Sequence, residues 1–201
     1  MSKTGKKKPR DLHSRHYRRY FAQHEEIGRL DEKGRTRIER IYRGDWTVQR
    51  LTDKERRTER ALLALLYVLA AALFFFAALR ELPGNRAWYL SAAHVASFAF
   101  LAWTLSGLFN YCGDGARMTV GEYASGALRF RLGSLLSAAA LGLCALLYLL
   151  CAALFDTDRG GHLLCAALCL LGALALLLAR RIDLRVPCET VENTQAAPPA
   201  E

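Results

Sequence analysis

The sequence predicts an all-α membrane protein: a four-transmembrane-helix bundle of two helical hairpins, with a small cytoplasmic β-hairpin region at its N-terminal side. Four apolar stretches carry this prediction, at about residues 61–79, 87–109, 132–155 and 162–179. A soluble chain of 201 residues has too small a core to enclose four helices that are apolar on every side. Charge is divided as well, because residues 1–60 contain 19 of the 28 Lys and Arg and the remainder is close to neutral.

The N-terminal third is polar and basic. We expect residues 1–12 to form a disordered basic arm, since they contain five basic side chains and no aliphatic run. Residues 13–51 are predicted to be a cytoplasmic region with a short β-hairpin. Its strands would be residues 35–42 and 45–51, joined by Arg43-Gly44-Asp45, with residues 23–30 as a third strand. The Arg-Gly-Asp triplet is interpreted as turn chemistry, because we place it on the cytoplasmic side.

The first membrane helix has a clear start. Thr52 and Glu55 have the spacing of a capping box, in which each side chain bonds the backbone N–H of the other residue. No charged residue follows between Ala61 and Leu79. These 19 residues span roughly 28 Å as a helix, close to the roughly 30 Å hydrocarbon core of a bilayer.

The later elements repeat this pattern. Thr119 and Glu122 have the same capping-box spacing, and a helix from Val120 would run directly into the third span. The membrane domain is therefore assigned to residues 52–186, and residues 187–201 to a disordered cytoplasmic tail. The two capped hairpins have two open interpretations: an internal repeat, or the pattern that any four-span chain with both ends on one side must show.

Basic residues near the span ends predict the orientation. Twelve lie on the side of the two termini and three on the other side, which places both termini in the cytoplasm of a plasma-membrane protein. Some of them are candidates for contact with the lipid bilayer and its anionic headgroups. These candidate membrane-surface residues are Arg56, Arg57, Arg60, Arg129, Arg131, Arg180 and Arg181.

No predicted span has Asp, Glu, Lys or Arg in its interior, which argues against proton-coupled transport and intramembrane metal sites. On the second span, His94, Ser97 and Thr104 share one face. His94 is level with Tyr148 of the third span, which predicts a hydrogen bond, and Thr104 is level with Tyr67. Two interpretations remain open: polar contacts between helices, or a histidine that senses pH or contacts a ligand.

Four cysteines fall in the last two spans: Cys144, Cys151, Cys165 and Cys169. The sequence leaves open whether they cluster. No His or carboxylate accompanies them, and thiols in an apolar environment behave as small apolar side chains. We therefore expect no metal and no cofactor.

Two short motifs, Ile41-Tyr-Arg-Gly-Asp-Trp46 and Met118-Thr-x-x-Glu-Tyr123, carry a resemblance. Together they resemble a group of small four-span bacterial membrane proteins of unknown function, over most of residues 35–180. The resemblance implies an integral protein of a cytoplasmic membrane and supplies no activity, cofactor or site.

These observations favour an accessory or scaffold protein that acts through its basic cytoplasmic face, and not an enzyme. A protein partner would bind residues 13–51 and 113–132, a homo-oligomer is also open, and no specific nucleic acid is expected. The alternative is a subunit of an oligomeric transporter or channel, with the polar stripe of the second span lining a path.

Overall fold

The computed structural model describes residues 23–30, 36–154 and 158–193. These residues divide into two compact units, described separately below. The smaller unit contains an N-terminal hairpin, and the larger unit runs from Trp46 to Val191. The predicted basic arm, residues 1–12, lies outside the described residues.

The hairpin of the smaller unit consists of strands β1 (His24–Leu30) and β2 (Thr36–Tyr42). They pair antiparallel, from His24 opposite Tyr42 to Leu30 opposite Thr36. The predicted pairing of residues 35–42 with 45–51 is therefore wrong, although a hairpin does lie within residues 13–51. The physical reason is that residues 23–30 take the place beside β2, while the strand after Arg43-Gly44-Asp45 pairs in the larger unit.

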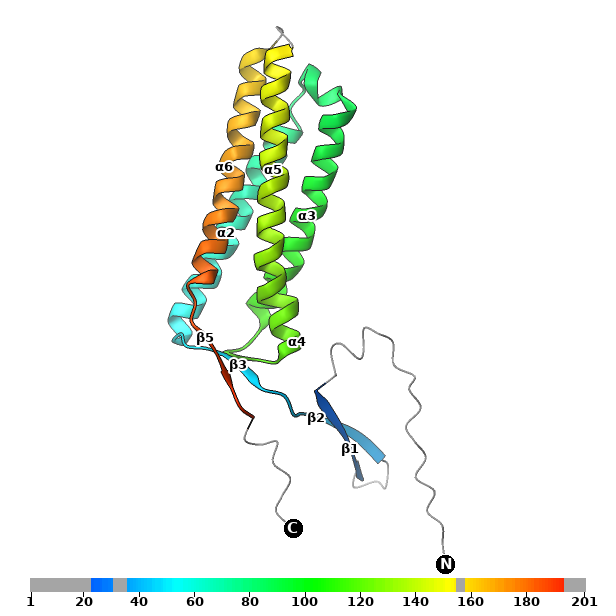
Figure 1. The fold of residues 1–201 in the computed structure, drawn as a ribbon, viewed down its shortest axis with the longest axis vertical. Helices are drawn as coiled ribbons and strands as arrows, with labels where there is room; N and C mark the ends of the chain where they lie inside the picture. The colour runs from blue at the N-terminus through cyan, green and yellow to red at the C-terminus, as the bar shows by residue number, and fades with distance from the viewer. Residues whose placement is uncertain (1–22, 31–35, 155–157, 194–201) are drawn as a thin grey trace, which may run out of the picture. The chain divides into compact units, whose positions relative to one another are not determined.

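The larger unit is built on long helices (Figure 1). Helices α2 (Asp53–Ala78), α3 (Trp88–Gly113) and α6 (Arg159–Leu184) each have 26 residues, or about 39 Å. The short helix α4 (Val120–Tyr123), a π-helical turn (Ala124–Leu128) and α5 (Arg129–Leu154) form one continuous helix of 35 residues. All four are long and apolar enough to cross a membrane.

Both predicted capping boxes are present, which explains where α2 and α4 begin. The Glu55 backbone N–H donates to the Thr52 hydroxyl at 3.3 Å, and the Thr52 N–H donates to the Glu55 carboxylate at 2.9 Å. The same two bonds join Thr119 and Glu122 at 3.2 and 2.7 Å. Each box satisfies N–H groups that the first turn of a helix leaves without a partner.

The helices do not pack in sequence order. The α5 helix packs against both α6 and α3, and α2 packs mainly against α6. The consecutive helices α2 and α3 touch much less, with the 3-10 turn Pro83–Arg86 between them. The packing order is therefore α2, α6, α5, α3, so the predicted first hairpin is held together mainly through the other two helices.

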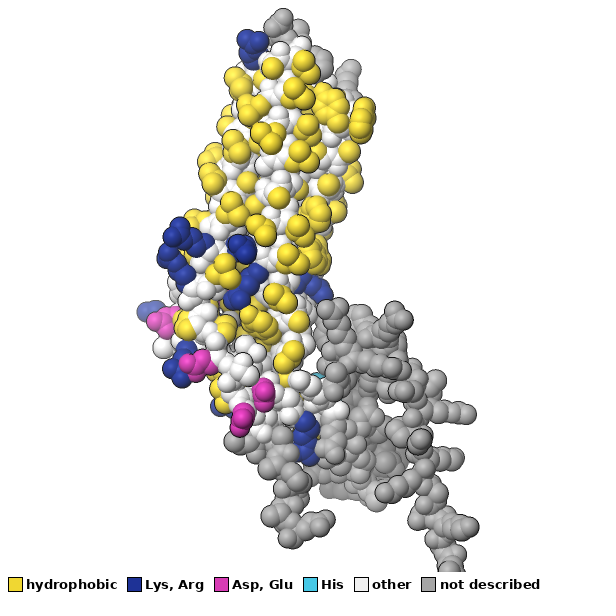
Figure 2. Space-filling model, viewed as in Figure 1, with side chains coloured by type: hydrophobic (Ala, Val, Ile, Leu, Met, Phe, Trp, Pro, Cys, Tyr) yellow, Lys and Arg dark blue, Asp and Glu magenta, His cyan; other side chains and the backbone are white. Residues whose placement is uncertain are grey.

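The helices enclose a mostly apolar core that includes a few buried polar side chains, and they are also apolar on the outside. Ser97, Thr104 and Ser137 are fully buried. In contrast, Leu65, Phe76 and Val95 are 64%, 63% and 69% exposed. Figure 2 shows hydrophobic side chains over much of this face, with Lys, Arg, Asp and Glu gathered mostly toward one end. A water-soluble protein rarely exposes apolar surface so continuously.

A three-stranded sheet lies at the charged end of the helices, hereafter the sheet end. Strand β3 (Trp46–Gln49) is central, with β4 (Arg117–Met118) and β5 (Cys188–Val191) antiparallel on its two sides. The prediction of a disordered tail over residues 187–201 is therefore wrong for β5; residues 194–201 lie outside the described residues. Pairing with β3 gives these residues backbone hydrogen-bond partners that a tail lacks.

Close helix approach depends on Gly133. A Cβ atom there would lie 2.6 Å from the Thr104 hydroxyl oxygen and 3.0 Å from the Thr104 Cα. We expect Gly133→Val to push α3 from α5 and lower the free energy of unfolding by about 1–3 kcal/mol, the usual cost of overpacking. Thermal unfolding in detergent, followed by circular dichroism, measures this.

The matched control is Gly142→Val, on the same helix, where an added Cβ would meet nothing within 4 Å. It should leave the unfolding temperature nearly unchanged. Equal losses in both variants would contradict a glycine-dependent contact between α3 and α5.

Candidate functional site

The predicted hydrogen bond between His94 and Tyr148 is present. The Tyr148 hydroxyl lies 3.1 Å from His94 Nε2, and it also donates to the backbone carbonyl of Ala77 at 2.9 Å. Tyr148 is fully buried and His94 is partly buried. One hydroxyl from α5 therefore joins α2 and α3, which contact each other little elsewhere.

The other residues of the polar stripe also bond to neighbouring helices. The Thr104 hydroxyl lies 2.9 Å from that of Ser137, and Ser97 Oγ lies 3.3 Å from the Cys144 sulfur. The Tyr67 hydroxyl donates to the Leu101 carbonyl at 2.9 Å. Thus the structure brings each predicted residue to another helix, but Tyr67 and Thr104 bond to different partners and not to each other.

The four thiols lie in one buried cluster near the end opposite the sheet. Cys144, Cys151, Cys165 and Cys169 are all buried and unbridged, packed among Ala and Leu side chains. Among the described residues, no three His, Cys, Asp or Glu side chains are placed to hold a metal ion. Packing accounts for this cluster, since small side chains let α5 and α6 approach closely.

The sheet end contains a buried ion pair that the sequence did not predict. Arg131 Nε donates to the carboxylate of Asp183, and Arg131 Nη2 donates to the Asp183 carbonyl at 3.3 Å. The Asp183 side chain is fully buried and that of Arg131 is 17% exposed. A third donor, Arg131 Nη1, bonds the Tyr123 hydroxyl at 2.8 Å. This pair ties the start of α5 to the end of α6.

Tyr111 forms a second contact at the same end, between α2, α3 and the sheet. Its hydroxyl donates to the Glu59 carboxylate at 3.2 Å and accepts from Gln49 Nε2 at 2.8 Å. The Arg60 guanidinium carbon lies 5.3 Å from the centre of the Tyr111 ring, a cation–π distance. Arg60 also donates to the Cys112 carbonyl at 3.0 Å. Gln49 is the last residue of β3, so this contact fixes the sheet to the helices.

The Arg131–Asp183 ion pair and the Tyr111–Glu59 contact interact electrostatically, because the Asp183 carboxylate acts on Glu59. Glu59 lies in α2 just before its apolar stretch. Burial, and then the nearby Asp183 carboxylate, raise the pKa of Glu59 to about 7. Burial and the Glu122 carboxylate likewise raise the pKa of Asp114, just after α3, to about 6. The sheet end therefore holds two carboxyl groups that titrate near neutral pH.

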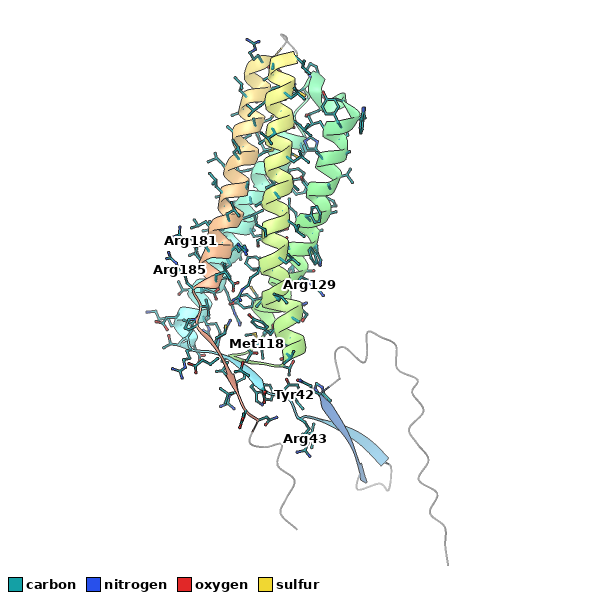
Figure 3. The ribbon with its side chains drawn as sticks, viewed as in Figure 1. Tyr42, Arg43, Met118, Arg129, Arg181 and Arg185 are labelled. Atoms are coloured by element: carbon teal, nitrogen blue, oxygen red, sulfur yellow. The ribbon has the colours of Figure 1, made fainter. Side chains whose placement is uncertain are left out.

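The seven basic residues predicted for the membrane surface differ in how far their side chains are exposed: two are exposed and five are partly buried. Arg57 and Arg181 are exposed, and Figure 3 shows Arg181 projecting away from α6. Arg131 is the clearest exception, because it lies in the buried pair with Asp183. The remaining four, Arg56, Arg60, Arg129 and Arg180, are partly buried.

Sequence reasoning missed the polar network at the sheet end: Gln49, Glu59, Tyr111 and Asp183. A signal was present for Asp183, the only acidic residue within the basic run Arg180–Arg185. An acidic side chain next to an apolar helix end, among arginines, is typical of a paired charge. No local signal identifies Gln49 or Tyr111, because their partners are distant in sequence.

Comparison with known proteins adds no assignment. No family model matches the chain, and searches of curated proteins and of solved structures found no significant match. The resemblance drawn over residues 35–180 therefore stays an interpretation of two short motifs.

Removing one partner of the buried ion pair should be costly. We expect Asp183→Asn to lower the free energy of unfolding by about 3 kcal/mol or more, because Arg131 would remain buried without a counter-charge. The double variant Arg131→Met/Asp183→Leu should recover most of this loss. Chemical unfolding in detergent compares the three proteins.

The control is Glu189→Gln, which breaks the exposed pair of Arg50 and Glu189. An exposed pair contributes less than about 1 kcal/mol, so little change is expected. A loss as small in Asp183→Asn as in Glu189→Gln would contradict the importance of the buried pair.

Glu59 predicts a pH dependence of stability. Between about pH 4.3, the ordinary value, and pH 7, the folded chain keeps a proton on Glu59 that the unfolded chain releases. Stability should therefore fall as the pH rises through this window. The unfolding temperature, measured from pH 5 to pH 8, should fall less steeply in Glu59→Gln than in the wild type.

Part of the slope should remain in Glu59→Gln, because the raised pKa of Asp114 acts in the same direction. The exposed Glu81 provides the control, and Glu81→Gln should keep the wild-type slope. Identical slopes in Glu59→Gln and the wild type would rule out this contribution of Glu59.

Proposed function

We propose that the chain is a multi-pass membrane protein whose four helices cross the lipid bilayer as a bundle, with the sheet end in the cytoplasm. Continuous exposed apolar surface on all four helices supports insertion. The basic residues gathered at the sheet end support the orientation, since cytoplasmic segments carry the excess of Lys and Arg.

Within this arrangement, the protein acts as an accessory or scaffold protein, and the sheet end is its interaction face. One observation carries the proposal: polar side chains inside the helices bond to neighbouring helices, whereas exposed polar groups gather at the sheet end. Arg117 of β4 and Glu189 and Thr190 of β5 are exposed there. Strands β3 and β4 belong to the two segments expected to bind a protein partner, residues 13–51 and 113–132.

The alternative, a transporter or channel subunit, is less well supported. Its path would run along His94, Ser97 and Thr104. Ser97 and Thr104 are fully buried, and each lies against a side chain of α5. These contacts fill the polar face of α3 with protein, which favours a packing role for the stripe.

Site-specific photo-crosslinking in intact cells tests the scaffold function. A photoreactive amino acid at Arg117 or Thr190, both exposed on the sheet, should give a discrete adduct with another protein. An adduct of twice the mass would identify the partner as a second copy of this chain. The same amino acid at Glu81 or Gly160, exposed at the opposite end, is the control.

The controls should not give the same adduct. Identical adducts from both ends, or none from the sheet, would contradict an interaction face at the sheet end.

A further inference from the structure

A groove opens on the surface at the sheet end, between α2 and the end of α6. Its volume is about 580 Å³. One wall comes from the start of α2 and the other from the segment that joins α6 to β5. The lining includes Lys54, Glu55, Glu59 and Leu62 on the first wall, and Ile182 and Arg185 on the second.

The groove is amphipathic along its length. Lys54 and Leu62 are eight residues apart on α2, so about 12 Å separates them along the helix axis. Lys54 lies among polar residues, and Leu62 lies at the start of the apolar stretch. On the facing wall, Ile182 contributes to the apolar end of the groove and Arg185 to the charged end. The headgroup layer of a bilayer is about 5–7 Å deep on each side, so the groove would cross from headgroups into hydrocarbon.

The carboxylates that line the groove have hydrogen-bond partners, whereas its two cations have no ion-pair partner in the described chain. The Glu55 carboxylate accepts from the Thr52 N–H and hydroxyl at 2.9 and 2.8 Å, and that of Glu59 accepts from Tyr111. The raised pKa of Glu59, about 7, also reduces its negative charge at neutral pH. Lys54 and Arg185 take part in no ion pair within the described chain.

Figure 3 shows Arg185 at the end of α6, projecting away from the helices. Lys54 and Arg185, which form no ion pair in the described chain, therefore lie at the polar end of a largely apolar groove. This combination complements a ligand with one anionic group and apolar chains.

We propose that this groove binds one anionic glycerophospholipid, with its phosphate at Lys54 and Arg185 and the first part of its acyl chains against Leu62 and Ile182. The proposal rests on the membrane insertion proposed above. It adds a specific lipid site to the general attraction between basic residues and anionic membranes. Because the groove contacts both α2 and α6, the lipid would join the first and last helices of the bundle.

Native mass spectrometry of the full chain in detergent tests the proposal. The protein is offered equal amounts of phosphatidylglycerol and phosphatidylcholine, and the retained lipid is counted. The wild type should retain phosphatidylglycerol preferentially. In Lys54→Ser/Arg185→Ser, phosphatidylglycerol affinity should fall about 30-fold, since each cation near an anionic surface contributes about fivefold.

The matched control is Arg57→Ser/Arg181→Ser, which removes two exposed cations from the same two helices but outside the groove. It should keep the wild-type preference. A third variant, Leu62→Trp, keeps every charge and fills the apolar part of the groove, so it should also lose the lipid. Thermal unfolding confirms that each variant is folded before it is compared.

Equal retention of the two lipids by the wild type would overturn the proposal. So would equal losses in the groove variant and the control, because surface charge in general would then explain binding. Alkaline carbonate extraction of cell membranes separates the two proposals. A chain released by carbonate contradicts membrane insertion, whereas a chain that resists extraction but shows no lipid preference contradicts the groove alone.

Discussion

The buried pair of Arg131 and Asp183 is the interaction on which the sheet end depends. A charge placed among helices is tolerated only with a counter-charge and further hydrogen bonds, and Arg131 obtains both from Asp183 and a third bond from Tyr123. The pair fixes the end of α6 against the start of α5. The strand that follows α6 can then reach β3, and β3 in turn carries Gln49 to Tyr111.

The two ends of the helices are held in different ways. Near the end opposite the sheet, the buried contacts are mainly between neutral groups: Tyr148 bonds His94 and a backbone carbonyl, amid buried thiols and alanines. The Arg159 side chain adds one bond there, to the Ala152 carbonyl at 3.0 Å. At the sheet end, ionised groups and a cation–π contact take over. This division fits the proposed membrane position, because a paired charge costs less to hold near headgroups and water than in the middle of hydrocarbon.

Patterns confined to one segment were readable from the sequence. Four apolar helices, both capping boxes and the level of His94 relative to Tyr148 follow from composition, spacing and helix rise alone. The sheet was not readable, because strands of two to four residues carry little pattern and their partners lie far away along the chain. The ion pair of Arg131 was not readable for the same reason: its partner Asp183 is 52 residues away.

The central position of β3 has a consequence for the order of assembly. Its two neighbours flank the helices made later: β4 precedes the third long helix, and β5 follows the fourth. During synthesis, β3 therefore leaves the ribosome long before it has both partners. The sheet can close only after the fourth helix has been made, so a complete sheet marks a chain in which all four helices have been synthesised.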